Sequence, residues 1–247
     1  MTKPSDSSRR KLLGSLAALP FVSAACSTPR NQIAAPTKAP SPPGVLSGET
    51  WRYRLINRYN DLPVGEVLAE VTQVEPKLTV SLTDQNGESL GQEIYASPWQ
   101  VVQEPFYNET LQFSQPVPLL PPDLAVGAQS QMTTRYSLGE DGRTRRWDSR
   151  TRAVGWERIQ VPAGQFDCLR IERIAYFEPA GLSKIRARRV ETLWYAPRIN
   201  RWAMREWTGF FIDETTVSDK RSALPIEERE DSVRWVLLQH LAAPVAQ

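Results

Sequence analysis

The chain has 247 residues, 40% of them hydrophobic, and its 30 Lys and Arg residues stand against 28 Asp and Glu residues. The basic excess belongs to the first 25 residues, which hold Lys3, Arg9, Arg10 and Lys11 but only Asp6 as an acid. The remaining 26 basic and 27 acidic residues are near balance. No overall field would attract nucleic acid, so a nucleic-acid partner is not expected.

The N-terminal segment has the pattern of a secretory signal peptide, which we place at residues 1–25. A basic end precedes an apolar run of eleven residues, 12–22, and small residues follow. The run is too short for a transmembrane helix, which needs about 20 residues. Residues 8–13 contain Arg9 and Arg10 and resemble the twin-arginine export signal. An ordinary secretory leader with two adjacent arginines is the alternative, and either route ends outside the cytoplasm.

Cys26 follows the residues Val-Ser-Ala-Ala at 22–25, and this segment resembles the lipobox of bacterial lipoproteins. In that family the cysteine is acylated and becomes the new N-terminus, which anchors the protein to a membrane. Ser23 departs from the family pattern, which has Leu, Val or Ile at that position, and residues 23–25 would also suit an ordinary signal peptidase. Ser27, rather than an Asp, favours the periplasmic side of the outer membrane as the location.

A linker follows the cysteine. Residues 27–48 contain five prolines together with small and polar residues, a composition typical of an extended tether. We therefore expect residues 26–48 to be a lipidated cysteine and a tether, and residues 49–247 to form a single β domain.

From about residue 50 onward, bulky apolar residues alternate with polar ones, which is the pattern of half-buried strands. Asn86-Gly87 and the turn at 162–165 predict hairpins, whereas the proline-rich segment 115–122 is expected to break the sheet as a loop or an edge crossing. Residues 226–231 are highly charged and could begin a helix. The predicted fold class is all-β, an antiparallel, strongly curved sheet of about ten strands that is half-barrel or sandwich-like. We predict strands at 51–56, 64–74, 78–83, 90–95, 129–138, 143–149, 156–161, 166–177, 184–195, 201–207 and 233–238.

Two motifs in the second half carry a family resemblance. They are the segment 155–166, with Pro162, Ala163, Gly164 and Phe166, and the segment 191–197, with Glu191, Trp194, Tyr195 and Pro197. With a Pro-Pro-Asp-Leu-Ala-Val-Gly step at 121–127, they resemble an uncharacterised family of Gram-negative envelope proteins, a domain of unknown function, over about residues 115–210. The resemblance implies a curved antiparallel sheet, similar in some members to the half-barrels that carry lipoproteins, and no established activity. Pro162 presets the turn and Gly164 permits a positive φ, so the first motif has a structural explanation.

Residues for catalysis or metal binding are scarce. His240 is the single histidine, so neither a catalytic triad nor a zinc site is expected. The sequence has no nucleophile elbow, phosphate-binding loop or dinucleotide fingerprint, and we expect no cofactor and no metal. If Cys26 is acylated, Cys168 has no disulfide partner, and we interpret Cys168 as a small buried apolar residue.

Four glutamates lie in or beside the predicted strands: Glu157, Glu172, Glu191 and Glu206. A pair of them could serve a glycoside hydrolase, which uses two carboxyl groups. Arginines occupy the same strands, so cross-strand ion pairs on a solvent-exposed face are the preferred interpretation. These arginines are Arg158, Arg170, Arg173, Arg186, Arg188, Arg189 and Arg205.

The tryptophans and a basic hairpin are further candidates for binding a ligand or a membrane surface. The eight tryptophans could pack the core of the β domain or line a ligand cavity; they are Trp51, Trp99, Trp147, Trp156, Trp194, Trp202, Trp207 and Trp235. Five arginines flank a predicted hairpin and could meet lipid or glycolipid head groups, although Asp141 and Asp148 dilute their charge; they are Arg143, Arg145, Arg146, Arg150 and Arg152.

These features predict a non-catalytic cell-envelope lipoprotein, held at the membrane by its lipid anchor, that binds a hydrophobic ligand or an envelope partner in its curved sheet. A carbohydrate-active hydrolase using paired strand carboxylates is one alternative, and a structural or assembly lipoprotein without a small ligand is another. The residues alone identify neither the ligand or partner nor the oligomeric state.

Overall fold

The computed structural model describes residues 31–106, 109–139, 142–179, 184–214 and 227–243. Cys26, Arg9 and Arg10 lie outside the described residues. The chain divides into two units, 1–30 and 31–247, and all the described residues belong to the second unit.

Nearly all regular structure in the described residues is β, with one short 3-10 helix, η1, at Pro197–Ile199. The strands are β1 (Gln32–Ile33), β2 (Thr50–Asn57), β3 (Leu62–Gln73), β4 (Leu78–Asp84), β5 (Ser89–Tyr95), β6 (Gln100–Phe106), β7 (Glu109–Pro118), β8 (Gln129–Leu138), β9 (Arg145–Val161), β10 (Gly164–Phe177), β11 (Lys184–Ala196), β12 (Arg201–Asp213) and β13 (Glu227–Leu241).

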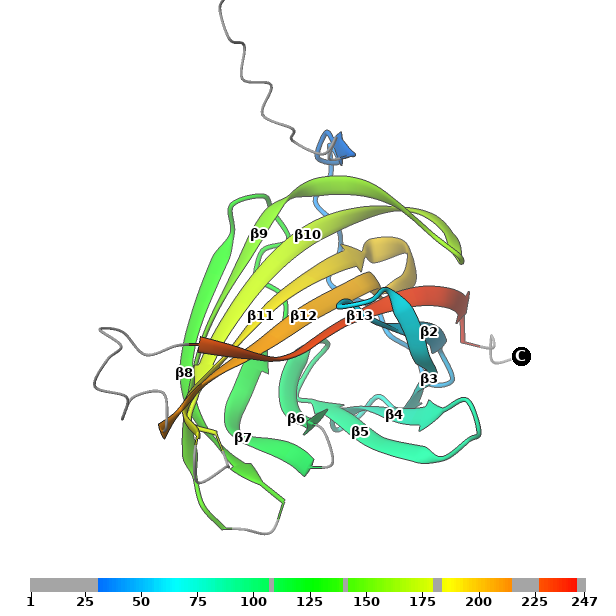
Figure 1. Ribbon diagram of the computed structural model, residues 1–247. Coiled ribbons are helices and arrows are strands. Elements are labelled where there is room, and N and C mark those ends of the chain that lie inside the picture. The colour runs from blue at the N-terminus through cyan, green and yellow to red at the C-terminus, as the bar shows by residue number, and fades with distance from the viewer. Residues whose placement is uncertain (1–30, 107–108, 140–141, 180–183, 215–226, 244–247) are drawn as a thin grey trace, which may run out of the picture. The chain divides into compact units, whose positions relative to one another are not determined.

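The strands form one antiparallel sheet that closes on itself. Neighbours in sequence pair in order from β2 to β13, β13 returns to pair with β2, and β8 pairs with β9. Within the described part of the chain this makes a closed barrel of twelve strands, with β1 added outside the ring on β9. Figure 1 shows the strands following one another around the barrel. The predicted all-β, antiparallel, strongly curved sheet is confirmed, and it closes fully rather than stopping as a half-barrel.

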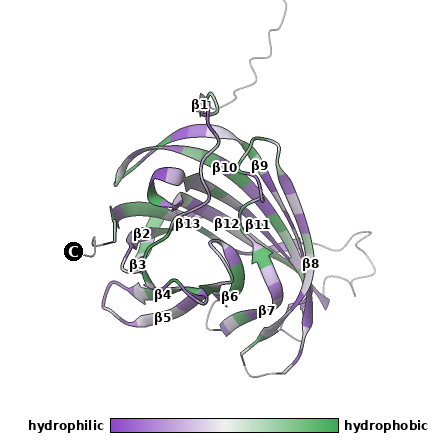
Figure 2. Cartoon of the chain, turned by 180° about the vertical axis from the view of Figure 1, so that it is seen from behind, coloured by the Kyte–Doolittle hydropathy of each residue, from purple (hydrophilic) through white to green (hydrophobic). Residues whose placement is uncertain are grey.

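Alternation along the strands separates a buried face from an exposed one. In β2, Trp51 and Tyr53 are buried whereas Arg52 and Arg54 are exposed, because successive side chains of a strand point to opposite faces of the sheet. The same alternation of apolar and polar residues is visible along the strands in Figure 2. Twelve strands enclose a wide interior, which large side chains must fill.

Two turns of the barrel follow directly from local chemistry. Between β4 and β5, Asp84 Oδ1 accepts hydrogen bonds from the backbone N–H groups of Asn86 and Glu88, each at 2.8 Å, and Gly87 has φ +84°. Between β9 and β10, Pro162 and Ala163 form a two-residue connection, and Gly164 adopts φ +125° opposite Val161. Glycine adopts such φ values without the steric cost that a Cβ would bring.

Several segments differ from the sequence-based expectation. The segments 143–149 and 156–161 belong to one long strand, β9, that continues past a register shift opposite Arg170 and Ile171. The charged residues 227–231 belong to β13 and do not form a helix, because β12 offers them a paired edge. Strands β6 and β7 add a hairpin that the sequence pattern did not reveal.

The proline-rich segment is part strand and part connection. Strand β7 extends to Pro118, although its ladder with β8 ends at Phe113. Residues 114–116 pair with neither β6 nor β8 in the described part of the chain, so Pro116, which has no N–H to donate, interrupts no ladder there. The predicted break of the ladder is thus correct for residues 115–116 and wrong for 117–118, which pair with β6.

Residues 31–48 pack against the barrel rather than forming a free tether. Residues Gln32 and Ile33 pair with β9 as β1, Val45 is buried in the core, and the Gly48 N–H donates to the carbonyl of Val71 at 2.8 Å. Most other side chains of this segment are exposed, so the segment is held by backbone pairing and by Val45.

Candidate functional site in the barrel interior

The interior of the barrel contains a buried ionic network. Among the described residues, four arginines and three glutamates contribute to it, all less than 8% exposed. They come from strands on opposite sides of the ring: Glu93 from β5, Glu104 from β6, Arg173 from β10, Arg189 and Glu191 from β11, and Arg201 and Arg205 from β12.

Glu191 is the meeting point of three guanidinium groups. Its Oε1 accepts from Arg205 Nε at 2.5 Å, its Oε2 accepts from Arg173 Nη1 at 2.9 Å, and Arg189 Nη2 lies 3.5 Å from Oε1. Burial alone would favour the protonated acid, but the charges of Arg205, Arg189 and Arg173 outweigh it and hold the pKa of Glu191 well below its usual value. Glu191 is therefore a carboxylate at neutral pH.

Arg205 joins the two halves of the network. Besides its bond to Glu191, its guanidinium lies 3.9 Å from Glu93 and 3.9 Å from Glu104. Glu93 in turn accepts from Arg201 Nη2 at 2.5 Å and from the hydroxyl of Tyr95 at 2.8 Å. Burial, with Glu93 adding to it, raises the pKa of Tyr95 well above its usual value, so the phenol stays protonated and donates.

Aromatic rings enclose these charges. The Arg201 guanidinium lies 4.0 Å from the ring centre of Trp202 and 4.9 Å from that of Trp99. The Arg189 guanidinium lies 4.7 Å from the ring centre of Trp207. Guanidinium groups stack well on aromatic faces, which partly replaces the hydration that burial removes. The network is thus fixed by rings as well as by ion pairs.

A pocket of about 320 Å³ opens on one side of this network. Its floor includes Arg189, Arg205, Glu93 and Glu104, and its wall is mostly apolar. The apolar and aromatic lining residues are Leu55, Val64, Val67, Leu82, Leu90, Pro105, Phe106, Trp207, Val233 and Trp235. An apolar pocket with a few convergent polar groups is typical of a small-molecule site, and this volume lies at the small end of the usual range.

Asp231 lies at the edge of the pocket and is fully engaged in hydrogen bonds. Its Oδ2 accepts from Trp207 Nε1 at 2.9 Å, and its Oδ1 accepts from the backbone N–H of Gly209 at 2.9 Å. Asp231 is only partly buried, so solvent screens its charge. Its role is to fix the Trp207 ring, on which Arg189 stacks.

The four glutamates considered for hydrolysis are not gathered in one cleft. All four form ion pairs, as expected: Glu157 and Glu172 with Arg170, and Glu206 with Arg58 and Arg234. The expected solvent-exposed face is wrong for Glu191, because the inward face of β11 places this residue inside the barrel.

The family-motif residues are divided between two faces of the sheet. Glu191 and Tyr195 lie on the same face of β11 as the buried Leu193, whereas Trp194 points the other way and donates from Nε1 to Glu157 at 2.8 Å. Phe166 is buried beneath the guanidinium of Arg198, 4.5 Å from its ring centre. Pro197 begins η1, and the Ala163 N–H donates to the carbonyl of Leu237 at 3.2 Å, which docks the turn on β13.

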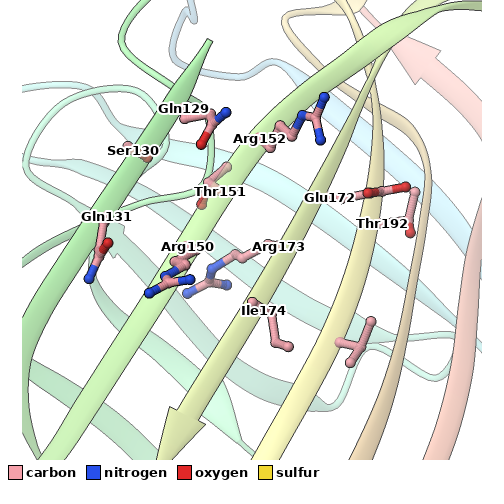
Figure 3. Close-up of a pocket in the computed structure, with 11 residues that line it drawn as sticks. Gln129, Ser130, Gln131, Arg150, Thr151, Arg152, Glu172, Arg173, Ile174 and Thr192 are labelled. Carbon is pink, nitrogen blue, oxygen red and sulfur yellow. The ribbon is translucent and has the colours of Figure 1, made fainter. Parts of the chain in front are cut away.

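The basic hairpin lies mostly outside the interior network. Arg146 pairs with Asp148, and Arg150 and Arg152 line a wide groove of about 970 Å³ over β8–β11, which Arg173 of the network also lines. Figure 3 shows Arg150, Arg152 and Glu172 on neighbouring strands of this groove. The groove is lined by residues of both charges, arginines and Glu172, and by few apolar side chains.

Most tryptophans pack the core, and two line the pocket. Trp51, Trp99, Trp147 and Trp202 are fully buried, and Trp156 is nearly so. Trp207 and Trp235 line the pocket, with ring centres 5.9 Å apart. Packing is therefore confirmed for the first five tryptophans, and a ligand-binding role of Trp207 and Trp235 stays a prediction.

His240 and Cys168 have local structural roles. His240 Nε2 lies 2.9 Å from Glu49 Oε1, and its ring stacks on Trp51 with ring centres 6.0 Å apart. Cys168 is buried and has no disulfide partner among the residues described. Burial raises the pKa of its thiol well above the usual value, so the unreactive thiol form prevails.

Sequence reasoning missed Glu93, Glu104 and Arg201. It also placed Arg173, Arg189 and Arg205 on a solvent-exposed face of the sheet. A usable signal was present: in β11, the apolar residues Ala187 and Leu193 share the parity of positions 189 and 191, so alternation alone assigns those two charges to the inner face.

Within the described ranges, no group of three or more His, Cys, Asp or Glu residues is arranged to hold a metal ion. No helix among the described residues is long and apolar enough to cross a membrane.

Comparisons with models of protein families give no match, and comparisons with curated proteins give none. The similar solved structures include three whose descriptions follow. One is described as "a putative lipoprotein" from Parabacteroides distasonis, with TM-score 0.46 and 14% identity, covering 83% of this chain and 100% of that one. The second is the hypothetical lipoprotein YmcC from Escherichia coli, with TM-score 0.44 and 13% identity, covering 81% and 87%. The third is described as an exported protein with a YmcC-like fold from Bacteroides fragilis, with TM-score 0.44 and 14% identity, covering 83% and 100%.

Proposed function

We propose that this chain is a non-catalytic lipoprotein of the cell envelope whose barrel binds an apolar ligand in its interior pocket. The observation that carries the proposal is the pocket of about 320 Å³, with its apolar wall and its buried charged floor. Burying apolar surface of a ligand contributes about 25 cal/mol per Å². A ligand whose hydrocarbon chain covers the apolar wall of the pocket would therefore gain most of its affinity from that contact.

The location is proposed from the N-terminal sequence. A twin-arginine leader with Arg9 and Arg10 would export the chain, and acylation of Cys26 would hold it at the periplasmic side of the outer membrane. More than one acyl chain gives stable anchoring, and a ligand pocket next to a membrane would have direct access to membrane-derived apolar molecules.

We propose that the protein is not a catalyst because of the protonation state and the ion pairs of its buried carboxyl groups. A general acid or base works best when its pKa lies near the working pH. Glu191 has the opposite environment, because three guanidinium groups keep it ionised. Glu93, Glu104 and Glu191 all contact Arg205, which supports a structural role for these carboxylates.

The binding test uses the full chain carrying Cys26→Ser, exported and purified without detergent. The probe is N-phenyl-1-naphthylamine, a neutral apolar molecule whose fluorescence rises in an apolar site. We expect saturable binding at one site. Val233→Trp, on the pocket wall, should weaken binding at least tenfold by filling the space, while Val126→Trp, at an exposed position before β8, is the matched control and should bind normally.

Two results would contradict the proposal. One is the lack of any saturable binding of the probe. The other is equal binding by the Val233→Trp and Val126→Trp proteins, which would place the apolar site elsewhere. Either result would favour a structural or assembly role without a small ligand.

A further inference from the structure

We propose that the pocket is specific for a single-chain amphiphile with an anionic head group, and that Arg189 binds this head group. The inference rests on the proposed function and names the chemical class of its ligand. The relevant chemistry is one apolar chain ending in a carboxylate or a phosphate.

The buried network carries an excess of positive charge. Within the described residues, four guanidinium groups meet three carboxylates, Glu93, Glu104 and Glu191, so one positive charge is uncompensated. A buried charge without a partner is costly. One negative charge brought by a ligand would remove this imbalance.

Arg189 is the arginine of the network with the weakest carboxylate contact. Arg173, Arg201 and Arg205 each have a carboxylate oxygen within 2.9 Å. The nearest carboxylate oxygen to Arg189 is 3.5 Å away, on Glu191, which already accepts from Arg173 and Arg205.

Arg189 also has an unused donor, and this donor is buried. Its side chain is 92% buried, since its exposed fraction is 8%, and its Nε has no hydrogen-bond partner in the described part of the chain. Arg189 lines the pocket, and the ring of Trp207 holds its guanidinium plane. A planar guanidinium fixed in this way presents its N–H groups to a carboxylate or phosphate with little loss of entropy on binding.

Three acidic residues also line the pocket and oppose an anion. Glu93 pairs with Arg201 at 2.5 Å, and both oxygens of the partly exposed Asp231 accept hydrogen bonds. Glu104 lies 3.9 Å from Arg205, and its Oε1 has no hydrogen-bond partner among the described atoms. Within the network itself, four guanidinium groups still face three carboxylates, and Arg189 is the one without a carboxylate oxygen within 2.9 Å.

The wall and the volume define the rest of the ligand. Leu55, Val67, Leu82 and Val233 offer apolar contacts beside the charged floor. A volume of about 320 Å³ suits one chain of medium length, since each group the size of a water molecule occupies about 30 Å³. Two acyl chains of a phospholipid would exceed it.

The test measures displacement of N-phenyl-1-naphthylamine from the Cys26→Ser chain at pH 8 by decanoate, decyl phosphate and 1-decanol. The three compounds share one apolar chain and differ in the head group. We expect at least one of the two anions to compete at a concentration roughly tenfold lower than decanol or better, the gain expected from one charge-assisted hydrogen bond. The more effective anion identifies the head group as carboxylate or phosphate.

Variants at neighbouring positions of β11 assign the effect. Arg189→Met should abolish the preference for the anion, and Arg189→Lys, which keeps the charge, should retain part of it. Arg188→Met is the matched control, because Arg188 points away from the interior and pairs with Glu227 at 2.6 Å; its preference should be unchanged.

The outcomes separate this inference from the proposed function. Equal competition by decanol and both anions would overturn the inference and leave apolar binding standing. The inference also fails if Arg189→Met keeps the preference for the anion, or if the probe binds and none of the three compounds displaces it. Failure of the probe itself to bind would overturn the proposed function and the inference together. The comparison of the three compounds on the unsubstituted pocket does not depend on the folding of any variant at position 189.

Discussion

Arg205 on β12 and Glu191 on β11 form a diagonal pair inside the barrel, with Arg205 Nε donating to Glu191 Oε1 at 2.5 Å. In the ladder, Arg205 is opposite Leu193 and Glu191 is opposite Trp207, so the two side chains reach each other across one step of the register. Diagonal neighbours on one face of a sheet are within reach of long side chains. Both residues are nearly fully buried, so the pair lies where charges are costly unless they are matched.

Removing the charge of Glu191 should strongly destabilise the barrel. Glu191→Gln leaves Arg173 and Arg205 without their shared carboxylate, and breaking a buried pair in this way costs about 3–5 kcal/mol. The free energy of unfolding, from urea titration followed by tryptophan fluorescence, checks this. The matched control is Glu172→Gln, whose side chain is 51% exposed beside Arg170 and which should cost less than about 1 kcal/mol. Equal losses in the two variants would mean that the interior network does not stabilise the fold.

Stability should fall on acidification because of the same residue. The folded-state pKa of Glu191 lies below its ordinary value of 4.5, which applies to the unfolded chain. Its contribution is therefore fully present above pH 4.5 and is lost as the pH falls below that value, since the unfolded chain then binds a proton that the folded chain excludes. Urea midpoints measured from pH 7 to pH 3 check this. Glu191→Gln should show a shallower decrease over that range, and an unchanged slope would contradict the assignment.

The sequence predicted the class of the fold better than its closure. Alternation identified strands such as β2, β8 and β11 almost residue by residue because each has one buried and one exposed face. It could not show that β8 pairs with β9 while β13 pairs with β2, because ring closure depends on strand tilt and register, which no local pattern encodes. β6 and β7 escaped detection because Pro105, Pro116 and Pro118 mask their alternation.

The inward position of some charged residues could be predicted from the sequence, but these residues were predicted to lie on the exposed face. Arginine and glutamate are usually exposed, and that expectation outweighed the parity of Arg189 and Glu191 with their apolar neighbours on β11. Glu93 carried the same signal in β5, since it shares parity with the buried Tyr95. What the sequence could not supply is that strands from opposite sides of a ring bring these charges together.

Cys168 should be inert towards thiol reagents in the folded protein. Its side chain is fully buried, and burial raises the pKa of its thiol, so neither access nor thiolate is available. In the Cys26→Ser chain, reaction with iodoacetamide at pH 8 should be negligible under native conditions and complete in urea, as read by mass spectrometry. Rapid modification without denaturant would show that β10 opens locally.

Gly164 should be needed for the turn between β9 and β10. Its φ of +125° is strained for any residue with a Cβ, although a Cβ there would meet no atom within 4 Å. Gly164→Ala should therefore destabilise the protein by about 1–3 kcal/mol through backbone strain alone. Gly65→Ala is the control, because Gly65 is also free of contacts and its φ is not positive. Urea midpoints compare the two, and a Gly164→Ala protein as stable as the Gly65→Ala protein would contradict this account of the turn.

Membrane anchoring should depend on Cys26 and not on Cys168. In a Gram-negative host, the unsubstituted chain should incorporate labelled palmitate and sediment with the outer membrane, since several acyl chains hold a protein firmly while one gives only marginal binding. Cys26→Ser should lose the label and move to the soluble periplasmic fraction. Cys168→Ser, which changes a buried thiol of the barrel, should keep both the label and the membrane association. If the Cys26→Ser chain retained the label and stayed with the membrane, the anchor would have to lie elsewhere in the chain.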